Sequence, residues 1–544
     1  MSLRSRSYDV LPALSVRRRE LRHSLRRVTV AWMFGVVWMS CTSGDQVRAF
    51  CRMLGFNDFA FGLMGALPFL ASLGQLLAAE FIERTGLRKH LFIPLALVHR
   101  LLWLVVAAVP LVLGPGYLAV TVVLAILAAS NFLGQASSPA WVTWMGDLIP
   151  RRIRGRYFAR RTQASQAVQV VAVIVLSVFL DHATSSGRVE SLAGQGRLMW
   201  TICIIFAIGA IFGAIDILVF WRIREVLPPH GPQASAAPRA GESWWQALRG
   251  SLADLLIHPL KDRIFRNFVS YGAVVTFTMT VSGWYFWRYS TEGLGFSKLG
   301  TNCLFMVIGP LAGTVTAKWW GRLQDRWGRR PVLILSTLGA AISLLPWFFM
   351  SRAVTTPAFL VDTINWISAH LGMLWGARDL HIVGPTSPVV AYLLASLGCV
   401  IGGSAWTGVG LAQTGMILGF SDSRGGSKFV AACSVLMGIG GVVGGLVGGA
   451  VAQSLEFMQS HPIVLGPLKW NNWHVTFAMS LLARLLSLAW LNRMPDPGAR
   501  TVRSMLRYWS ASTYNNYFSF LSHPLRIFGW GQGKVEDDRR RPRQ

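Results

Sequence analysis

Long apolar runs alternate with short polar segments along almost the whole chain. Most runs hold close to the ~20 residues that a helix needs to cross a bilayer, and they are too continuously apolar for the strands of a membrane barrel. Because a spanning segment must satisfy its own backbone hydrogen bonds, we interpret them as transmembrane helices. The twelve predicted helices cover residues 28–50, 59–79, 90–113, 117–139, 163–180, 198–221, 268–287, 299–320, 331–350, 389–406 with an extension toward 420, 429–455 and 473–491. The predicted fold class is an all-α integral membrane protein.

The charged residues define the expected orientation. Of the 544 residues, 53% are hydrophobic and 14% are charged, and the net charge of +28 raises the question of a nucleic-acid partner. The basic residues, however, gather before the first predicted helix, after the second, fourth and eighth, and in the C-terminal tail. The positive-inside rule then places both termini in the cytoplasm, most simply at a bacterial inner membrane. The charge therefore predicts contact with anionic lipid headgroups and no nucleic-acid partner.

Other sequence features bear on signal-peptide cleavage, metal binding and catalysis. The first predicted helix has no separate small-residue cleavage site and carries Trp32 and Trp38, so we expect it to be retained. The six cysteines show no metal-ligand spacing, and no phosphate loop or catalytic motif is present. We expect no metal, no cofactor and no enzymatic activity.

The chain contains an internal duplication. The tripeptide "LGF" at Leu54 recurs at Leu294, an offset of 240, which places Arg48 opposite Arg288. The segment "AEFIERTGLRK" from Ala79 matches "GRLQDRWGRRP" from Gly321 at an offset of 242. One six-helix unit therefore occurs twice in parallel orientation, as in transporters whose path lies between the two halves.

The duplication sets the predicted domain boundaries. We expect a basic cytoplasmic tail over 1–27, a six-helix bundle over 28–222, a cytoplasmic linker over 223–264, a second bundle over 265–492 and a cytoplasmic tail over 493–544. In the linker, Trp245, Leu248 and Leu252 fall on one helical face, which predicts an amphipathic helix in the headgroup plane.

The sequence "GRLQDRWGRRP" between the eighth and ninth predicted helices resembles the cytoplasmic loop signature of the major facilitator superfamily. A weaker copy lies between the second and third, where Ala79 replaces the opening glycine and Glu83 the aspartate. The resemblance extends over nearly the whole chain and implies two pseudo-symmetric six-helix bundles. It also implies that the two loops hold the cytoplasmic ends of the bundles together when the cavity faces outward. The implied gating residues are Glu83, Arg84, Gly86, Arg88, Gly321, Asp325, Arg326, Gly328, Arg329 and Arg330. The alternative is a charged loop that only sets topology.

Polar residues inside the predicted helices are the candidates for solute binding or ion coupling. Asp45 and Arg48 stand three apart on one helix face, as a coupling site or as a static pair. His99, Arg100 and Asp216 are further ionisable residues of lower rank. Neutral candidates for a cavity wall are Asn131, Gln135, Gln166, Gln169 and Trp406, and their alternative is contact between helices.

Glycines in the eleventh predicted helix, "GIGGVVGGLVGG", form two adjacent stripes at a spacing of four, which predicts close helix packing. The corresponding fifth helix lacks glycine, whereas the resemblance implies a glycine- and proline-rich motif there in drug exporters of the superfamily, which argues against a drug/proton antiporter.

These patterns predict a monomeric secondary transporter that moves a small polar or amphipathic solute by alternating access, as a uniporter or with protons as a symporter. The alternative is a transporter-like membrane sensor or assembly factor without transport activity.

Overall fold

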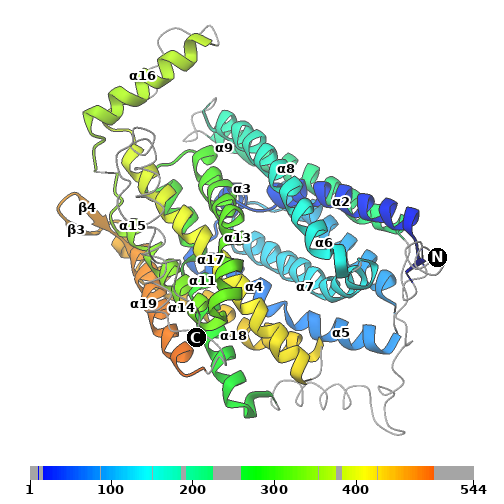
Figure 1. Cartoon of the computed structure of the whole chain (residues 1–544). Coiled ribbons are helices and arrows are strands. Elements are labelled where there is room, and N and C mark those ends of the chain that lie inside the picture. Colours follow the sequence, from blue (N-terminus) through cyan, green and yellow to red (C-terminus); the bar gives the residue numbers. More distant parts are fainter. Residues whose placement is uncertain are drawn as a thin grey trace, which may run out of the picture.

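The computed structural model describes residues 10–11, 16–85, 87–149, 151–185, 192–223, 259–352, 354–374, 383–424 and 427–494. The described part is almost entirely helical (Figure 1). The predicted amphipathic linker helix and most of both tails lie outside these residues.

The first half of the chain supplies one group of helices. Its elements are β1 (Val10–Leu11), β2 (Val16–Arg17), α2 (Arg18–Cys41), α3 (Asp45–Met53), α4 (Asp58–Leu70), α5 (Leu73–Thr85), α6 (Arg88–Val112), α7 (Tyr117–Leu148), α8 (Arg151–Ser185), α9 (Leu192–Val219) and the short η1 (Phe220–Arg222).

The second half begins after the linker. Its elements are η3 (Pro259–Lys261), α11 (Arg263–Arg288), η4 (Tyr289–Gly293), α12 (Lys298–Asn302), η5 (Cys303–Ile308), α13 (Gly309–Trp327), α14 (Arg329–Ile342), α15 (Leu345–Phe348), α16 (Ala358–Leu374), α17 (Val389–Arg424), α18 (Ser427–Ser454), η6 (Glu456–Gln459), β3 (Ile463–Leu465), β4 (Leu468–Trp470) and α19 (Asn472–Asn492).

Ten helical segments in the described part are long and apolar enough to cross a membrane, and each matches one of the twelve predicted helices. The predicted first and seventh helices correspond to α2 and α11, which lie among the other ten but are more polar. The arginine-rich start of α2 and the serine, threonine and arginine residues of α11 explain their lower hydropathy. The fold class is therefore confirmed, and the count of twelve is consistent with it.

The first predicted helix is not continuous. The prediction of one helix over 28–50 is wrong at residues 42–44, where α2 ends and α3 begins. Gly44 has a φ of +88°, and a Cβ there would lie 2.7 Å from Oδ1 of Asn302 in the other half. The break lets the start of α3 meet the second half of the chain.

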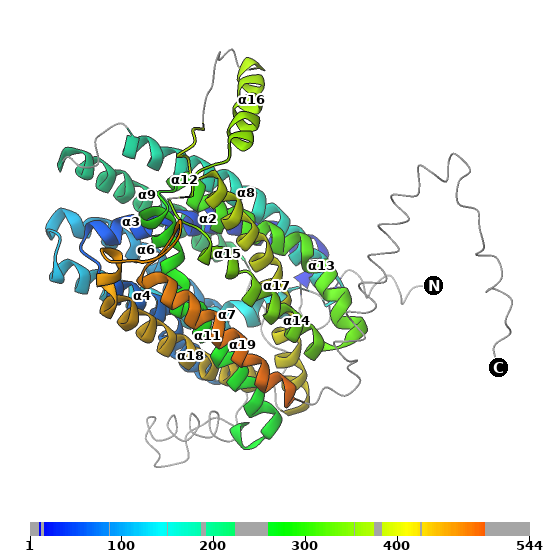
Figure 2. The ribbon, with the colours of Figure 1, turned by 90° about the vertical axis from the view of Figure 1, so that its left-hand side faces the viewer.

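The segment between α15 and α17 contains a helix that the sequence patterns did not predict. Helix α16 projects away from the rest of the molecule, on the side where the β3–β4 hairpin also lies (Figure 1). Figure 2 shows the same projection from a second direction.

Helix α18 joins the two halves through its glycine stripes. A Cβ on Gly448 would lie 2.5 Å from the carbonyl oxygen of Val281 on α11, in the same half. A Cβ on Gly62 of α4, in the other half, would lie 2.5 Å from the carbonyl oxygen of Gly445. The predicted close packing is confirmed, and the two stripes serve two different helices.

Candidate functional site

Six ionisable residues meet where the two halves touch. We call them the interbundle charge cluster: Asp45, Arg48, Asp58, Arg288, Glu292 and Lys298. They come from α3, the first residue of α4, the end of α11, η4 and the first residue of α12. Four of them expose less than a tenth of their surface.

Glu292 links the two duplicated arginines of this cluster. Its Oε1 lies 2.8 Å from Nη1 of Arg48, and its Oε2 lies 2.9 Å from Nη2 of Arg288. Because Arg48 and Arg288 occupy equivalent places in the repeat, one carboxylate pairs with a cation from each half. Sequence reasoning aligned the two arginines but did not identify Glu292, although its position four residues after Arg288 is a spacing that favours a helical ion pair.

Asp45 and Asp58 complete the cluster. Asp45 accepts from Nε of Arg48 at 2.5 Å, and Nζ of Lys298 from the other half lies 3.4 Å from its second oxygen. Asp58 forms an ion pair with Arg288. The predicted Asp45–Arg48 pair is thus present on one helix face, and it also contacts the opposite half.

Further hydrogen bonds join the two halves in the same region. Asn302 accepts from the backbone N–H of Asp45 at 2.9 Å and donates to Ser177 at 2.9 Å. Asp181 accepts from the backbone N–H groups of Lys298 and Leu299, both at 2.9 Å. A carboxylate at the N-terminus of a helix is favourable because the exposed N–H groups point toward it. These bonds tie α3 and α8 to the start of the eighth spanning segment.

A polar cavity of about 610 Å³ lies beside the cluster. Arg48, Arg52, Arg352, Lys469 and Glu292 contribute its charged groups, so its lining carries an excess of positive charge.

The first half encloses a second cavity, of about 680 Å³. The predicted residues Asn131 and Gln135 line it together with His99, Arg100 and Asp216. Nη2 of Arg100 lies 3.1 Å from Oδ2 of Asp216, and its guanidinium lies over Trp38 at 3.5 Å from the ring centroid. The structure therefore joins two ionisable residues that the sequence named separately.

The other predicted polar residues have different surroundings. Gln135 accepts from Gln75 of α5 at 2.6 Å, which supports the alternative of contact between helices. Gln166 and Gln169 are half-buried on α8 and are not among the residues that line the 680 Å³ cavity. Trp406 lines a third cavity, of about 470 Å³, in the second half, with Arg484 from α19.

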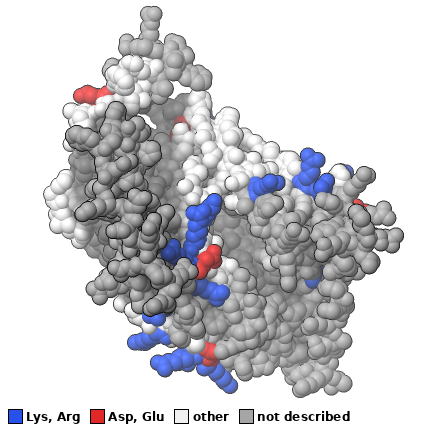
Figure 3. Space-filling view, viewed as in Figure 1, with Lys and Arg blue, Asp and Glu red and all other residues white. Residues whose placement is uncertain are grey.

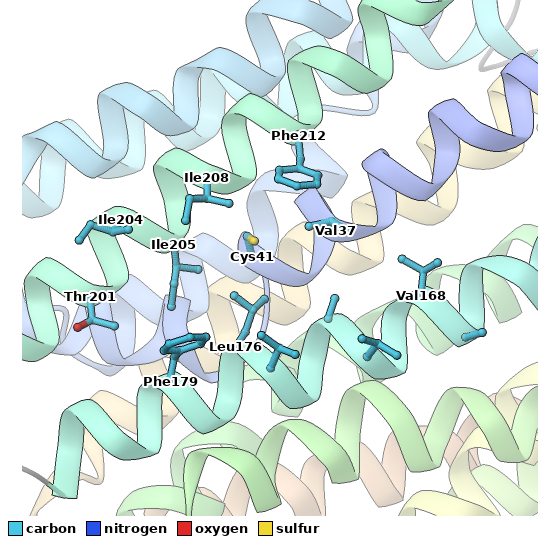
Figure 4. Close-up of a pocket in the computed structure, with 14 residues that line it drawn as sticks. Val37, Cys41, Val168, Leu176, Phe179, Thr201, Ile204, Ile205, Ile208 and Phe212 are labelled. Atoms are coloured by element: carbon cyan, nitrogen blue, oxygen red, sulfur yellow. The ribbon is translucent and has the colours of Figure 1, made fainter.

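An apolar groove of about 800 Å³ runs between α2, α8 and α9 (Figure 4). Val37, Val168, Phe179, Ile205 and Phe212 are typical of its lining. Thr201 supplies the one hydroxyl among the lining side chains, so the groove offers little to a polar solute.

The charged turn after α13 has the predicted geometry. Gly328 has a φ of +94° and separates α13 from α14, a conformation that glycine adopts without strain. The Asp325 side chain is exposed and, in the part of the chain that the structure describes, enters no ion pair. Arg330 donates to the carbonyl oxygen of Asn492 at 3.0 Å.

The weaker copy of this turn is only partly described. Arg88 is buried and donates to the carbonyl oxygen of Thr143 at 3.4 Å. Gly86 and the side chains of Glu83 and Arg84 lie outside the described residues.

The visible charges are unevenly distributed. In Figure 3 the lysine and arginine side chains appear at the centre, in the lower part and on the right-hand side of the molecule, away from the projecting α16.

Comparison with known proteins identifies the family. The model of the Major Facilitator Superfamily matches residues 29–413. The fold is similar to a mutant form of the nucleoside transporter NupG, with a TM-score of 0.57, 11% identity, and coverage of 86% of this chain and 99% of that one. It is also similar to a partially occluded inward-open form of the xylose transporter XylE from E. coli, with a TM-score of 0.51, 15% identity, and coverage of 88% and 100%.

A third similar structure is a D-xylose–proton symporter, with a TM-score of 0.53, 14% identity, and coverage of 87% and 99%. No curated protein matches the sequence. At these identities the solved structures establish the fold, and the family model covers well over half of the chain. This protein therefore belongs to the Major Facilitator Superfamily and is a secondary transporter.

Proposed function

We propose that the protein moves a small polar or amphipathic solute by alternating access, and that the interbundle charge cluster closes one end of the path. The observation that carries this proposal is the pairing of Glu292 with arginines from both halves at 2.8 and 2.9 Å. Ion pairs between bundles form in one conformation and break in the other, so they can act as a latch.

The charged turn between α13 and α14, at the opposite end of the path from Glu292, also supports alternating access. The Asp325 carboxylate is exposed and free of ion pairs within the described residues. In an inward-facing state the Asp325 end is open and the Glu292 end is closed, and the exposed Asp325 carboxylate supports this assignment. The cavities within each half, of about 680 and 470 Å³, suit a small solute.

The test of this function is transport by the purified protein in vesicles, screened with a library of polar metabolites, with and without a pH gradient. Movement of at least one solute across the membrane supports the proposal. A protein that binds a solute but never moves it would favour the alternative, a transporter-like sensor or assembly factor.

The proposed orientation places both termini in the cytoplasm of a cell with an inner membrane, with the protein acting as a monomer among anionic lipids. In a cysteine-free background, we expect Ser460→Cys to react with an impermeant maleimide added to intact cells. Arg322→Cys should react only after the cells are permeabilised. Both side chains are exposed, so the membrane alone decides which one reacts. The reverse labelling pattern would overturn the orientation.

We expect Asp325→Asn to slow transport by about tenfold while it leaves equilibrium solute binding nearly unchanged. The substitution keeps the shape but removes the charge that pairs with an arginine or a helix N-terminus in the outward-facing state, a contribution of about 1–3 kcal/mol. Asp362→Asn, which makes the same substitution at an exposed residue of the projecting helix α16, is the control. Binding that falls in parallel with transport would contradict a gating role.

A further inference from the structure

Arg484 is a buried cation in the second half that has no acidic partner among the described residues. It lies on α19 with only 4% of its surface exposed. One guanidinium nitrogen donates to the carbonyl oxygen of Ala340 on α14, and Nε is buried without an acceptor. Within the residues that the structure describes, no carboxylate forms an ion pair with it. A charge in the membrane interior is expensive, and such residues are therefore candidates for function.

In the first half, a comparable buried arginine has a carboxylate partner. Arg100 is also buried and also lies over a tryptophan, but Asp216 lies 3.1 Å away and neutralises it. Arg484 lies over Trp406, at 5.1 Å from the ring centroid, with no such carboxylate in the described part of the chain. Within the described residues, the second-half cavity thus holds a cation without a carboxylate counter-ion.

The cavity beside Arg484 can hold an organic molecule. Its volume is about 470 Å³, within the range of small-molecule sites. Phe305, Trp347 and Trp406 provide aromatic walls, and Ser343 and Thr407 provide hydroxyl groups. An aromatic wall stacks on a planar solute, while the planar guanidinium binds two oxygens of one carboxylate or phosphate.

We propose that the solute is a small organic anion, and that Arg484 binds its carboxylate or phosphate while Trp406 packs on its planar part. This inference rests on the proposed transport function and specifies its substrate class. The polar cavity at the interbundle charge cluster agrees with it, since four basic side chains and one carboxylate line it. An excess of positive charge at a mouth raises the local concentration of anions.

The test is direct binding to the full-length protein in nanodiscs, which requires no transport. The probes are benzoate, its neutral isostere benzamide, and phenyl phosphate, measured by calorimetric titration at a fixed chloride concentration. We expect at least one anion to bind about tenfold or more tightly than benzamide, because a hydrogen bond to a charged group discriminates by that factor or more. Preference for benzoate or for phenyl phosphate identifies the anionic group.

Arg484→Met should abolish the preference for the anion and should not lower the melting temperature, because it replaces an unpaired buried charge by an apolar side chain of similar length. Arg493→Gln, an exposed arginine at the end of the same helix, is the matched control and should bind as the unmodified protein does.

Three outcomes would overturn the proposal. They are equal binding of benzamide and both anions, unchanged anion binding by Arg484→Met, and failure of Arg484→Met to fold, which would assign Arg484 a structural role. Failure of the vesicle assay to detect transport would refute the proposed function but would leave the result of this titration intact.

Discussion

Glu292→Gln is expected to open the end of the path that the interbundle charge cluster closes, and to reduce transport by about tenfold or more. Gln keeps the shape of the side chain but removes the charge that Arg48 and Arg288 share. Truncating one partner of a buried charge pair costs about 2–5 kcal/mol. We expect the low end of this range, because the Glu292 side chain keeps 24% of its surface exposed to solvent.

The opening of the interbundle charge cluster can be measured by the reactivity of a cysteine placed beside it. Ser177 is fully buried at the contact between α8 and Asn302, so in the cysteine-free background Ser177→Cys should react slowly with an impermeant maleimide. With Glu292→Gln added, the labelling rate should rise by about tenfold or more. Asp362→Asn removes a carboxylate charge from an exposed residue of the projecting helix α16 and should leave the rate unchanged. Equal labelling with and without Glu292 would show that the cluster does not hold this end closed.

The fold was predictable because the bilayer imposes a coarse constraint. An apolar segment long enough to cross the bilayer satisfies its own backbone hydrogen bonds as a helix. Ten predicted spans therefore coincide with helical segments of the structure. The glycine stripes and the turn at Gly328 were also predictable from the sequence. Each depends on a property of glycine alone, its small size or its backbone freedom.

Tertiary contacts could not be predicted in the same way. Glu292 lies outside every predicted span, and nothing local shows that two arginines 240 positions apart converge on it. The Arg100–Asp216 pair likewise joins α6 to α9, which sequence spacing alone does not bring together. The interruption at Gly44 lies where Asn302 of the other half approaches too closely for a side chain, and sequence spacing does not show that approach. Residue type therefore identified several candidates, but partner choice depended on how the bundles pack.

Asp45 gains a more specific role from its surroundings. It is fully buried in the closed cluster, where Arg48 from its own helix and Lys298 from the other half hold its two oxygens. Separation of the halves removes Lys298 and admits water. We propose that Asp45 takes up a proton once the salt bridge to Arg48 also opens, because the loss of both cations favours the neutral acid, which then no longer attracts Lys298. Proton binding would thereby favour the open end and couple the gate to a proton gradient.

Asp45→Asn should accordingly abolish accumulation of solute against its gradient and leave exchange of solute across the membrane in place. Asn imitates the protonated acid permanently, so the gate still opens and closes but no proton is taken up or released. The measurement is uptake into vesicles with an imposed pH gradient, compared with exchange of labelled for unlabelled solute. Asp58→Asn is the matched control, since Asp58 is as deeply buried in the same cluster but pairs with Arg288. It should weaken closure yet retain accumulation. Full proton-driven accumulation by Asp45→Asn would make this carboxylate purely structural, and Asp216 and His99, which line the first-half cavity, would become the residues to test.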